Sequence, residues 1–208
     1  MKIEIRSDSA VVDGYVNAVE RESRLIMDVQ GDFREKVKAG TFEKALKRTE
    51  NVRMLLNHDK NRVLANTKDG TLGLYEDSIG LRARATITDP EVIEKAKKGE
   101  LRGWSFGFIA NADEWEKRDN APSTRTLTDI ELTEVSLIDN TRMPAYVGTS
   151  VETRDGKDVL NELREMDKCK VYISDFSEVR TTDNPDDNND NDLNKFKERL
   201  EKLKKHKN

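Results

Sequence analysis

Apolar and polar residues alternate in short runs along the first 150 residues, and this pattern predicts a fold made mainly of β-strands. The first run, residues 2–6, alternates strictly, and later runs rich in Val, Ile and Leu lie between polar turns. The expected strands are residues 2–6, 15–19, 25–29, 52–56, 63–67, 72–75, 81–87, 104–109 and 127–138.

Helical patterns are inserted between and after these strands. Residues 33–48 are predicted to be helical with an interruption at Gly40, and residues 155–168 place Val159, Leu160, Leu163 and Met166 on one helical face. Asp89, Pro90 and Glu91 form a strong helix start, because an N-cap acid precedes a proline and an acidic first turn. That helix should end at Gly99. The order of elements predicts an α+β, mainly β fold, a barrel or sandwich decorated with helices.

The C-terminal end has a different composition. Residues 181–192 are dominated by Asp and Asn and predict a disordered acidic linker. Residues 193–208 form a basic segment in which Leu193, Phe196, Leu200 and Leu203 recur at helical spacing. Two interpretations stay open for this tail, a helix that orders on a partner or on a second copy, and a frayed solvated end. The expected organisation is a domain over residues 1–150, a helical extension over 151–180, the linker and the tail.

Composition excludes several classes of protein. The longest uncharged run, residues 103–112, is too short to cross a membrane, and the N-terminus has no signal-peptide core. The single cysteine cannot form an internal disulfide and suits the cytoplasm. One Cys and two His cannot build a zinc cluster, so no metal is expected, and the composition also agrees with the absence of an organic cofactor. A net charge of −4 disfavours a nucleic-acid-binding barrel.

Three residues are candidates for catalytic chemistry. His58 is the only histidine before the tail and follows an apolar run, so it is either the general base or an ordinary loop histidine. Ser105 shares a strand face with Gly107, which leaves room for a substrate, although a solvent-facing serine on a packed strand has the same pattern.

The third candidate is an acid on an apolar row. In an extended strand, Glu134 lies on the same face as Ile130, Leu132 and Ser136, whereas Glu131 lies on the more polar face. A buried carboxylate needs a donor or a positive charge, and an imidazolium would serve. The alternative is a β-bulge that turns Glu134 outward. A histidine, a serine and an acid together can form a base, a nucleophile and an orienting group.

Three segments in this order carry a resemblance to a known family. They are residues 54–59 (Met-Leu-Leu-Asn-His-Asp), residues 101–108 (Leu-Arg-Gly-Trp-Ser-Phe-Gly-Phe) and residues 132–138 (Leu-Thr-Glu-Val-Ser-Leu-Ile). From about Gly14 to Tyr146 the chain resembles the prohead maturation serine proteases of tailed bacteriophages, which are related in fold to the herpesvirus assemblins. It departs from them at residues 140–144, where the family has a shorter turn. The resemblance implies a closed or partly closed assemblin-like β-barrel of about seven to eight strands with helices around it.

The resemblance also implies roles and partners. Ser105 is expected to be the nucleophile, His58 its base and Glu134 the third member, with Arg142 near the oxyanion site. The expected substrates are the scaffolding protein or the scaffold-like arm of the major capsid protein, and the enzyme itself, inside the immature procapsid in the host cytoplasm; a homodimer, as in assemblins, is also implied. Nucleic acid and membranes are not expected partners. The alternative is a non-catalytic assembly or scaffolding protein that keeps the protease fold.

Overall fold

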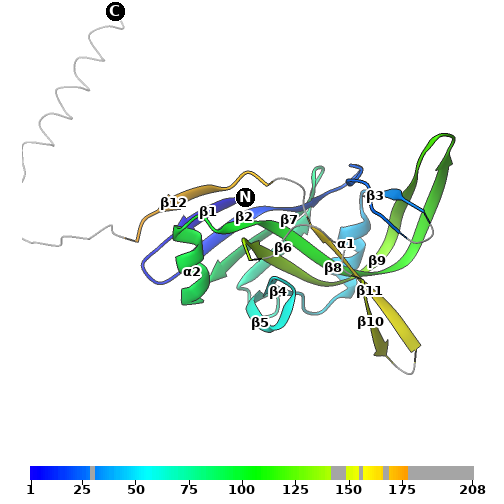
Figure 1. The fold of residues 1–208 in the computed structure, drawn as a ribbon. Coiled ribbons are helices and arrows are strands. Elements are labelled where there is room, and N and C mark those ends of the chain that lie inside the picture. The colour runs from blue at the N-terminus through cyan, green and yellow to red at the C-terminus, as the bar shows by residue number, and fades with distance from the viewer. Residues whose placement is uncertain (29–30, 142–148, 155–156, 166–168, 178–208) are drawn as a thin grey trace, which may run out of the picture. The chain divides into compact units, whose positions relative to one another are not determined.

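In the part of the chain that the structure describes, the strands form two sheets (Figure 1), and residues of both sheets contribute to one apolar core. The computed structural model describes residues 1–28, 31–141, 149–154, 157–165 and 169–177. Within these residues, five strands form the first sheet in the order β12-β1-β2-β7-β6. Only the β1–β12 pair in it is parallel. The strands of this sheet are β1 (Lys2–Ile5), β2 (Ala10–Ala18), β6 (Leu72–Glu76), β7 (Gly80–Ile87) and β12 (Tyr172–Asp175).

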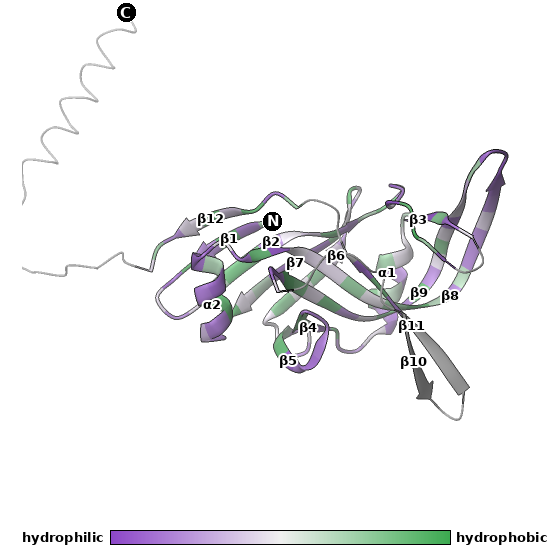
Figure 2. Cartoon of the chain, in the orientation of Figure 1, coloured by the Kyte–Doolittle hydropathy of each residue, from purple (hydrophilic) through white to green (hydrophobic). Residues whose placement is uncertain are grey.

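The second sheet is built around one long hairpin and has seven strands in the described part of the chain. Its order is β10-β11-β8-β9-β4-β5, and β3 pairs with another stretch of β9. The far half of β8 is exposed, and Figure 2 shows mainly polar residues at the tip of that hairpin. The strands are β3 (Phe33–Val37), β4 (Arg53–Leu56), β5 (Asp59–Asn66), β8 (Leu101–Arg118), β9 (Ala121–Asp139), β10 (Thr149–Arg154) and β11 (Lys157–Glu165).

In the described residues, two helices pack against the core. The helix α1 (Thr41–Arg48) joins β3 to β4, so that both strands run parallel to β9. The helix α2 (Pro90–Lys97) begins as the sequence predicts, since the Asp89 side chain accepts a hydrogen bond from the Val92 N–H at 3.1 Å. Gly99, just beyond it, has a φ of 69°, which suits a glycine at a helix end.

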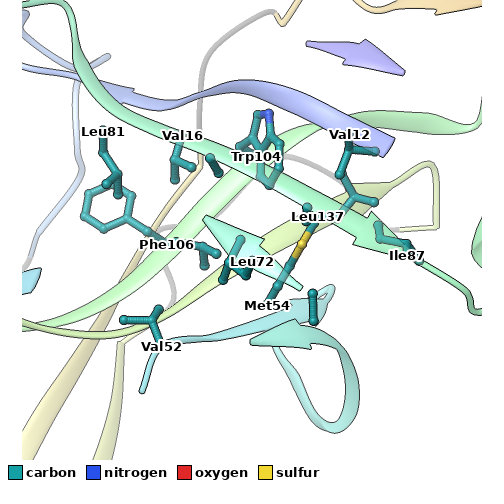
Figure 3. Close-up of a cluster of buried hydrophobic side chains, with 14 of the residues drawn as sticks. Val12, Val16, Val52, Met54, Leu72, Leu81, Ile87, Trp104, Phe106 and Leu137 are labelled. Carbon is teal, nitrogen blue, oxygen red and sulfur yellow. The ribbon is translucent and has the colours of Figure 1, made fainter. Parts of the chain in front are cut away.

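Side chains from both sheets and both helices form the core. Figure 3 shows part of it, where Val12 and Val16 of β2 lie near Trp104 and Phe106 of β8 and Met54 of β4. On β8, the three aromatic side chains of the alternating run all belong to the core, which confirms the predicted apolar face. The opposite face of β8 and β9 carries Ser105 and Ser136, which lie outside that core cluster although both are fully buried.

Several expectations about the fold need correction. The mainly β character is confirmed. A closed or partly closed barrel of seven to eight strands was expected; in the described residues the second sheet ends in β10 and β5 and the first in β12 and β6, so no closed barrel is found. In place of a strand over residues 25–29, the described part has only an isolated bridge between Ile26 and Phe33.

The predicted helix over residues 33–48 is wrong in its first part. Residues Phe33–Val37 form β3, in which burial alternates with period two. The sequence hid this alternation because one buried position, Glu35, carries a charge. That charge is compensated by Arg125 and Arg164 from distant parts of the chain.

The helical extension is also wrong where the structure describes it. The segment expected to be helical over residues 155–168 contains β11, which pairs with β8 on one side and β10 on the other. The apolar spacing that predicted a helix is outweighed by backbone pairing to β8, a partner that the local sequence does not reveal. Met166 and the linker and tail predictions lie outside the described residues, while residues Met1–Glu178 form one compact unit.

Candidate active site

His58 is presented by a tight two-residue turn between β4 and β5. Asn57 and His58 have φ values of 53° and 61°, the left-handed values that two-residue hairpin turns require. The turn is attached to the end of β9, because the Asn57 N–H donates to the Leu137 carbonyl and the His58 N–H donates to Ser136 Oγ. The Asn57 side chain in turn accepts a hydrogen bond from the Asp139 N–H. An unusual backbone conformation is thus held by several contacts at once.

A β-bulge in β9 decides which way Glu134 points. The ladder with β8 passes from Leu132 directly to the pair formed by Glu134 and Gly107, which leaves Thr133 as an extra residue. Leu132 and Val135 both belong to the core, so Glu134 lies on the opposite face. Strict alternation along the sequence predicted Glu134 on the same face as Leu132, and that prediction is wrong. The bulge exists, yet Glu134 remains buried, because other side chains cover it on this second face.

Glu134 and His58 form a buried pair. His58 Nδ1 lies 2.6 Å from Glu134 Oε1, and the side chains are only 5% and 9% exposed. The second carboxylate oxygen accepts a hydrogen bond from Ser136 Oγ at 2.6 Å. Because a carboxylate accepts hydrogen bonds, His58 Nδ1 is the donor in this contact, and Nε2 is the ring nitrogen left for other partners. His58 Nε2 is buried and has no hydrogen-bond partner in the described residues.

Gly107 provides the space for this carboxylate. A Cβ atom at residue 107 would lie 2.7 Å from Glu134 Oε1, closer than real Cβ contacts, and a tight 3.2 Å from Glu134 Cγ, so the Glu134 side chain would have to move. From the sequence, Gly107 was expected to leave room for a substrate beside Ser105. In the structure, side-chain atoms of the neighbouring strand approach it instead, including the Glu134 carboxylate that contacts His58.

Ser105 lies on the same face of the sheet as this pair. It stands directly opposite Ser136 in the β8–β9 ladder and two residues before Gly107. The Ser105 hydroxyl is fully buried and donates a hydrogen bond to the carbonyl oxygen of Arg164 on β11 at 2.7 Å. The structure therefore brings His58 and Glu134 into contact and places Ser105 on their face, with its hydroxyl proton directed at β11.

Sequence reasoning overlooked two groups that support His58. Ser136 bridges Glu134 and the His58 backbone, and its position two residues after Glu134 was the available signal. Asp139 is fully buried at the end of β9, beside the His58 turn. Burial raises the pKa of Asp139, but hydrogen bonds from Lys95 and Thr141 outweigh it, so the pKa lies well below its ordinary value and the carboxylate stays charged.

The remaining predictions concern Arg142, a metal site and membrane-spanning segments. Arg142, expected near the oxyanion site, lies outside the described residues. Among the residues that are described, we find no cluster of three or more His, Cys, Asp or Glu side chains suited to a metal ion. In the same part of the chain, the helices are too short or too polar to cross a bilayer.

A basic imidazole nitrogen, oriented by a carboxylate and lying on the same sheet face as a serine hydroxyl, can act in acyl transfer. The family model of the caudovirus prohead serine proteases matches residues 1–167. Comparison with curated proteins and with solved structures gave no significant match. Because the matched region covers most of the chain, the protein belongs to the caudovirus prohead serine protease family.

Proposed function

We propose that this member of the prohead serine protease family is an active endopeptidase that uses Ser105 as nucleophile, His58 as general base and Glu134 as the orienting acid. One observation carries the proposal: His58 Nδ1 contacts Glu134, which lies on the face of β9 that faces the same way as Ser105, at 2.6 Å, while His58 Nε2 is buried and has no partner among the described residues. A buried polar atom without a partner costs free energy, and sites that keep one generally use it.

The proposed reaction is acyl transfer to water. His58 Nε2 accepts the Ser105 proton while Ser105 Oγ attacks a peptide carbonyl, and Glu134 stabilises the imidazolium that forms. The imidazolium protonates the departing amine, and water then releases the acyl group from Ser105. Backbone N–H groups, with Arg142 nearby, would hold the oxyanion, and each such donor is worth about 3–4 kcal/mol.

Family membership supports a role in prohead maturation, which sets the substrate class. We infer that the substrates are the scaffolding protein or the scaffold-like arm of the major capsid protein, cleaved inside the immature procapsid in the host cell. The protease itself is a further substrate in this proposal. The acidic linker is the site of self-processing, and the basic tail docks on a scaffold helix through its apolar positions.

Co-expression with the capsid protein tests the proposal. The chain is produced beside its capsid protein in parallel with Ser105→Ala and His58→Ala, and the capsid subunit is weighed by mass spectrometry. We expect a shortened subunit only with the unmodified chain. Equal subunit masses in all samples would exclude the enzyme and favour a non-catalytic assembly protein. An intact Asn208 end on the mature chain would exclude self-processing in the linker or tail.

A further inference from the structure

The strand β11 lies directly beside the candidate nucleophile. Residues Glu162–Glu165 of β11 pair antiparallel with Ser105–Phe108 of β8, and Glu165 stands opposite Ser105. The Arg164 carbonyl oxygen accepts the hydrogen bond from Ser105 Oγ at 2.7 Å. A peptide carbonyl from an extended strand thus lies against the hydroxyl that the proposed mechanism uses.

Extended peptides bind proteins by adding a strand to an open sheet edge. At Ser105, β8 has β9 on one side and β11 on the other, so neither edge is open in the structure. The β9 side carries Glu134 and Ser136, which the site needs in place. A substrate strand that pairs with β8 at Ser105 therefore has to take the position of β11.

We propose that the edge of β8 over Ser105–Phe108 is the peptide-binding site of the protease. In this proposal β11 occupies the edge in place of a substrate and dissociates from β8 before a substrate segment pairs there. This inference rests on the proposed function. While β11 is in place, Ser105 Oγ donates to the Arg164 carbonyl, and His58 Nε2 has no partner in the part of the chain that the structure describes. Release of β11 frees the hydroxyl for His58 and opens the edge for an extended peptide.

The way β11 is held suits a removable strand. Its described side chains contribute nothing to the core cluster, whereas β8 and β9 contribute many of its members. Charge pairs hold it instead: Arg164 donates to both carboxylate oxygens of Glu35, and Glu162 accepts from Arg125 at 2.8 Å. Opening residues 162–165 of this strand breaks ion pairs, ladder hydrogen bonds and the contact of the Arg164 guanidinium with the Phe108 ring, whose centroid is 5.1 Å away, so local opening costs less than global unfolding.

The test loosens these charge pairs and measures access to Ser105. In Glu35→Gln combined with Arg164→Gln, both partners become neutral together, so the exchange leaves neither as a lone buried charge. The matched control, Asp13→Asn with Arg82→Gln, neutralises a pair on the other sheet. The probe is a fluorophosphonate: Ser105 Oγ forms a bond to phosphorus, fluoride leaves, and the proton passes to His58.

We expect the first double variant to react about tenfold faster than the unmodified protein, and the control variant to react at the unmodified rate. Tenfold corresponds to about 1.4 kcal/mol in the opening equilibrium of β11. Amide hydrogen exchange at residues 162–165 should accelerate in the first double variant alone. A free peptide with the β11 sequence, residues 157–165, should slow the labelling of Ser105 in the first double variant, and a scrambled peptide should not.

Each outcome has a distinct meaning. Equal labelling rates in the three proteins, together with faster exchange at residues 162–165, would overturn the inference and leave the proposed function intact. Labelling that the β11 peptide fails to slow would overturn the binding site. No labelling in any of the proteins would contradict the proposed function itself. If the double variant does not fold, Glu162→Gln removes one charge of the same set, and an unchanged labelling rate there would equally overturn the inference.

Discussion

Replacing Gly107 by alanine should disable the site although it adds no charge and removes no functional group. The new Cβ would lie 2.7 Å from Glu134 Oε1 and from Thr133 Oγ1. This separation is 0.7 Å shorter than 3.4 Å, the lower limit of ordinary van der Waals contact for a Cβ atom, so the neighbouring atoms must move. The Thr133 hydroxyl can turn to another rotamer. Glu134 has no such freedom, because hydrogen bonds hold both of its oxygens.

The magnitude follows from the hydrogen bond that the displacement affects. A shift of that size takes the 2.6 Å contact between Glu134 and His58 to about 3.3 Å, beyond the usual range for such bonds. A hydrogen bond to a charged group contributes about 1.5–3 kcal/mol. If the transition state depends on it fully, kcat/KM should fall roughly 10- to 100-fold.

The assay is hydrolysis of a peptide that spans the capsid cleavage site, with thermal unfolding measured in parallel. The matched control is Gly73→Ala in β6, where the new Cβ meets only the Arg84 carbonyl oxygen at an ordinary 3.7 Å, so activity should be unchanged. In a Glu134→Ala background the carboxylate is gone, and Gly107→Ala should then cost no more than about twofold. An equal loss from Gly107→Ala in both backgrounds would refute the reasoning.

Three further predictions concern the acids and the second serine. Glu134→Gln should lower kcat/KM by roughly a hundredfold or more but retain more activity than Ser105→Ala. Glu131→Gln, on the exposed side of β9, should change kcat/KM little. A larger loss of kcat/KM from Glu131→Gln than from Glu134→Gln would contradict the observed register. Ser136→Ala should lower kcat by roughly tenfold, through loss of the hydrogen bond to Glu134, with partial rescue by Ser136→Thr; steady-state kinetics checks both. Because the pKa of Asp139 is lowered in the folded protein, its contribution to stability is present above the ordinary pKa of about 4 and is lost as pH falls through the lowered value. Asp139→Asn should therefore reduce the free energy of unfolding by about 1–3 kcal/mol at neutral pH, and denaturant titrations should show this difference shrinking below about pH 4, whereas a constant difference would contradict the argument.

The sequence alone was sufficient wherever structure depends on neighbours along the chain. Alternation placed β1, and apolar runs between polar turns placed β4, β6 and β7, close to their observed bounds, while the capping residues placed α2. The aromatic face of β8 was also readable, because side chains alternate strictly along an extended strand. Candidate residues His58 and Glu134, predicted to act together, lie in contact in the structure. Their catalytic roles remain predictions.

Only the tertiary structure decided the features that depend on distant partners. The charge of Glu35 concealed β3, because Arg125 and Arg164 lie far along the chain. The strand β11 was predicted to be a helix, because its pairing with β8 is formed with residues far away in the sequence.

The same division applies within the candidate site. Residue types and order made His58, Ser105 and Glu134 candidates, but the face that Glu134 occupies depends on the bulge at Thr133, whose position is set by the pairing of β8 with β9. The hydrogen-bond partner of Ser105 depends on β11. Local sequence patterns indicate which residues favour an extended or a helical backbone and which side chains are expected to be buried. Strand register, bulges and charge pairs are set by contacts between segments that are distant in the sequence. They are therefore decided only when the chain folds.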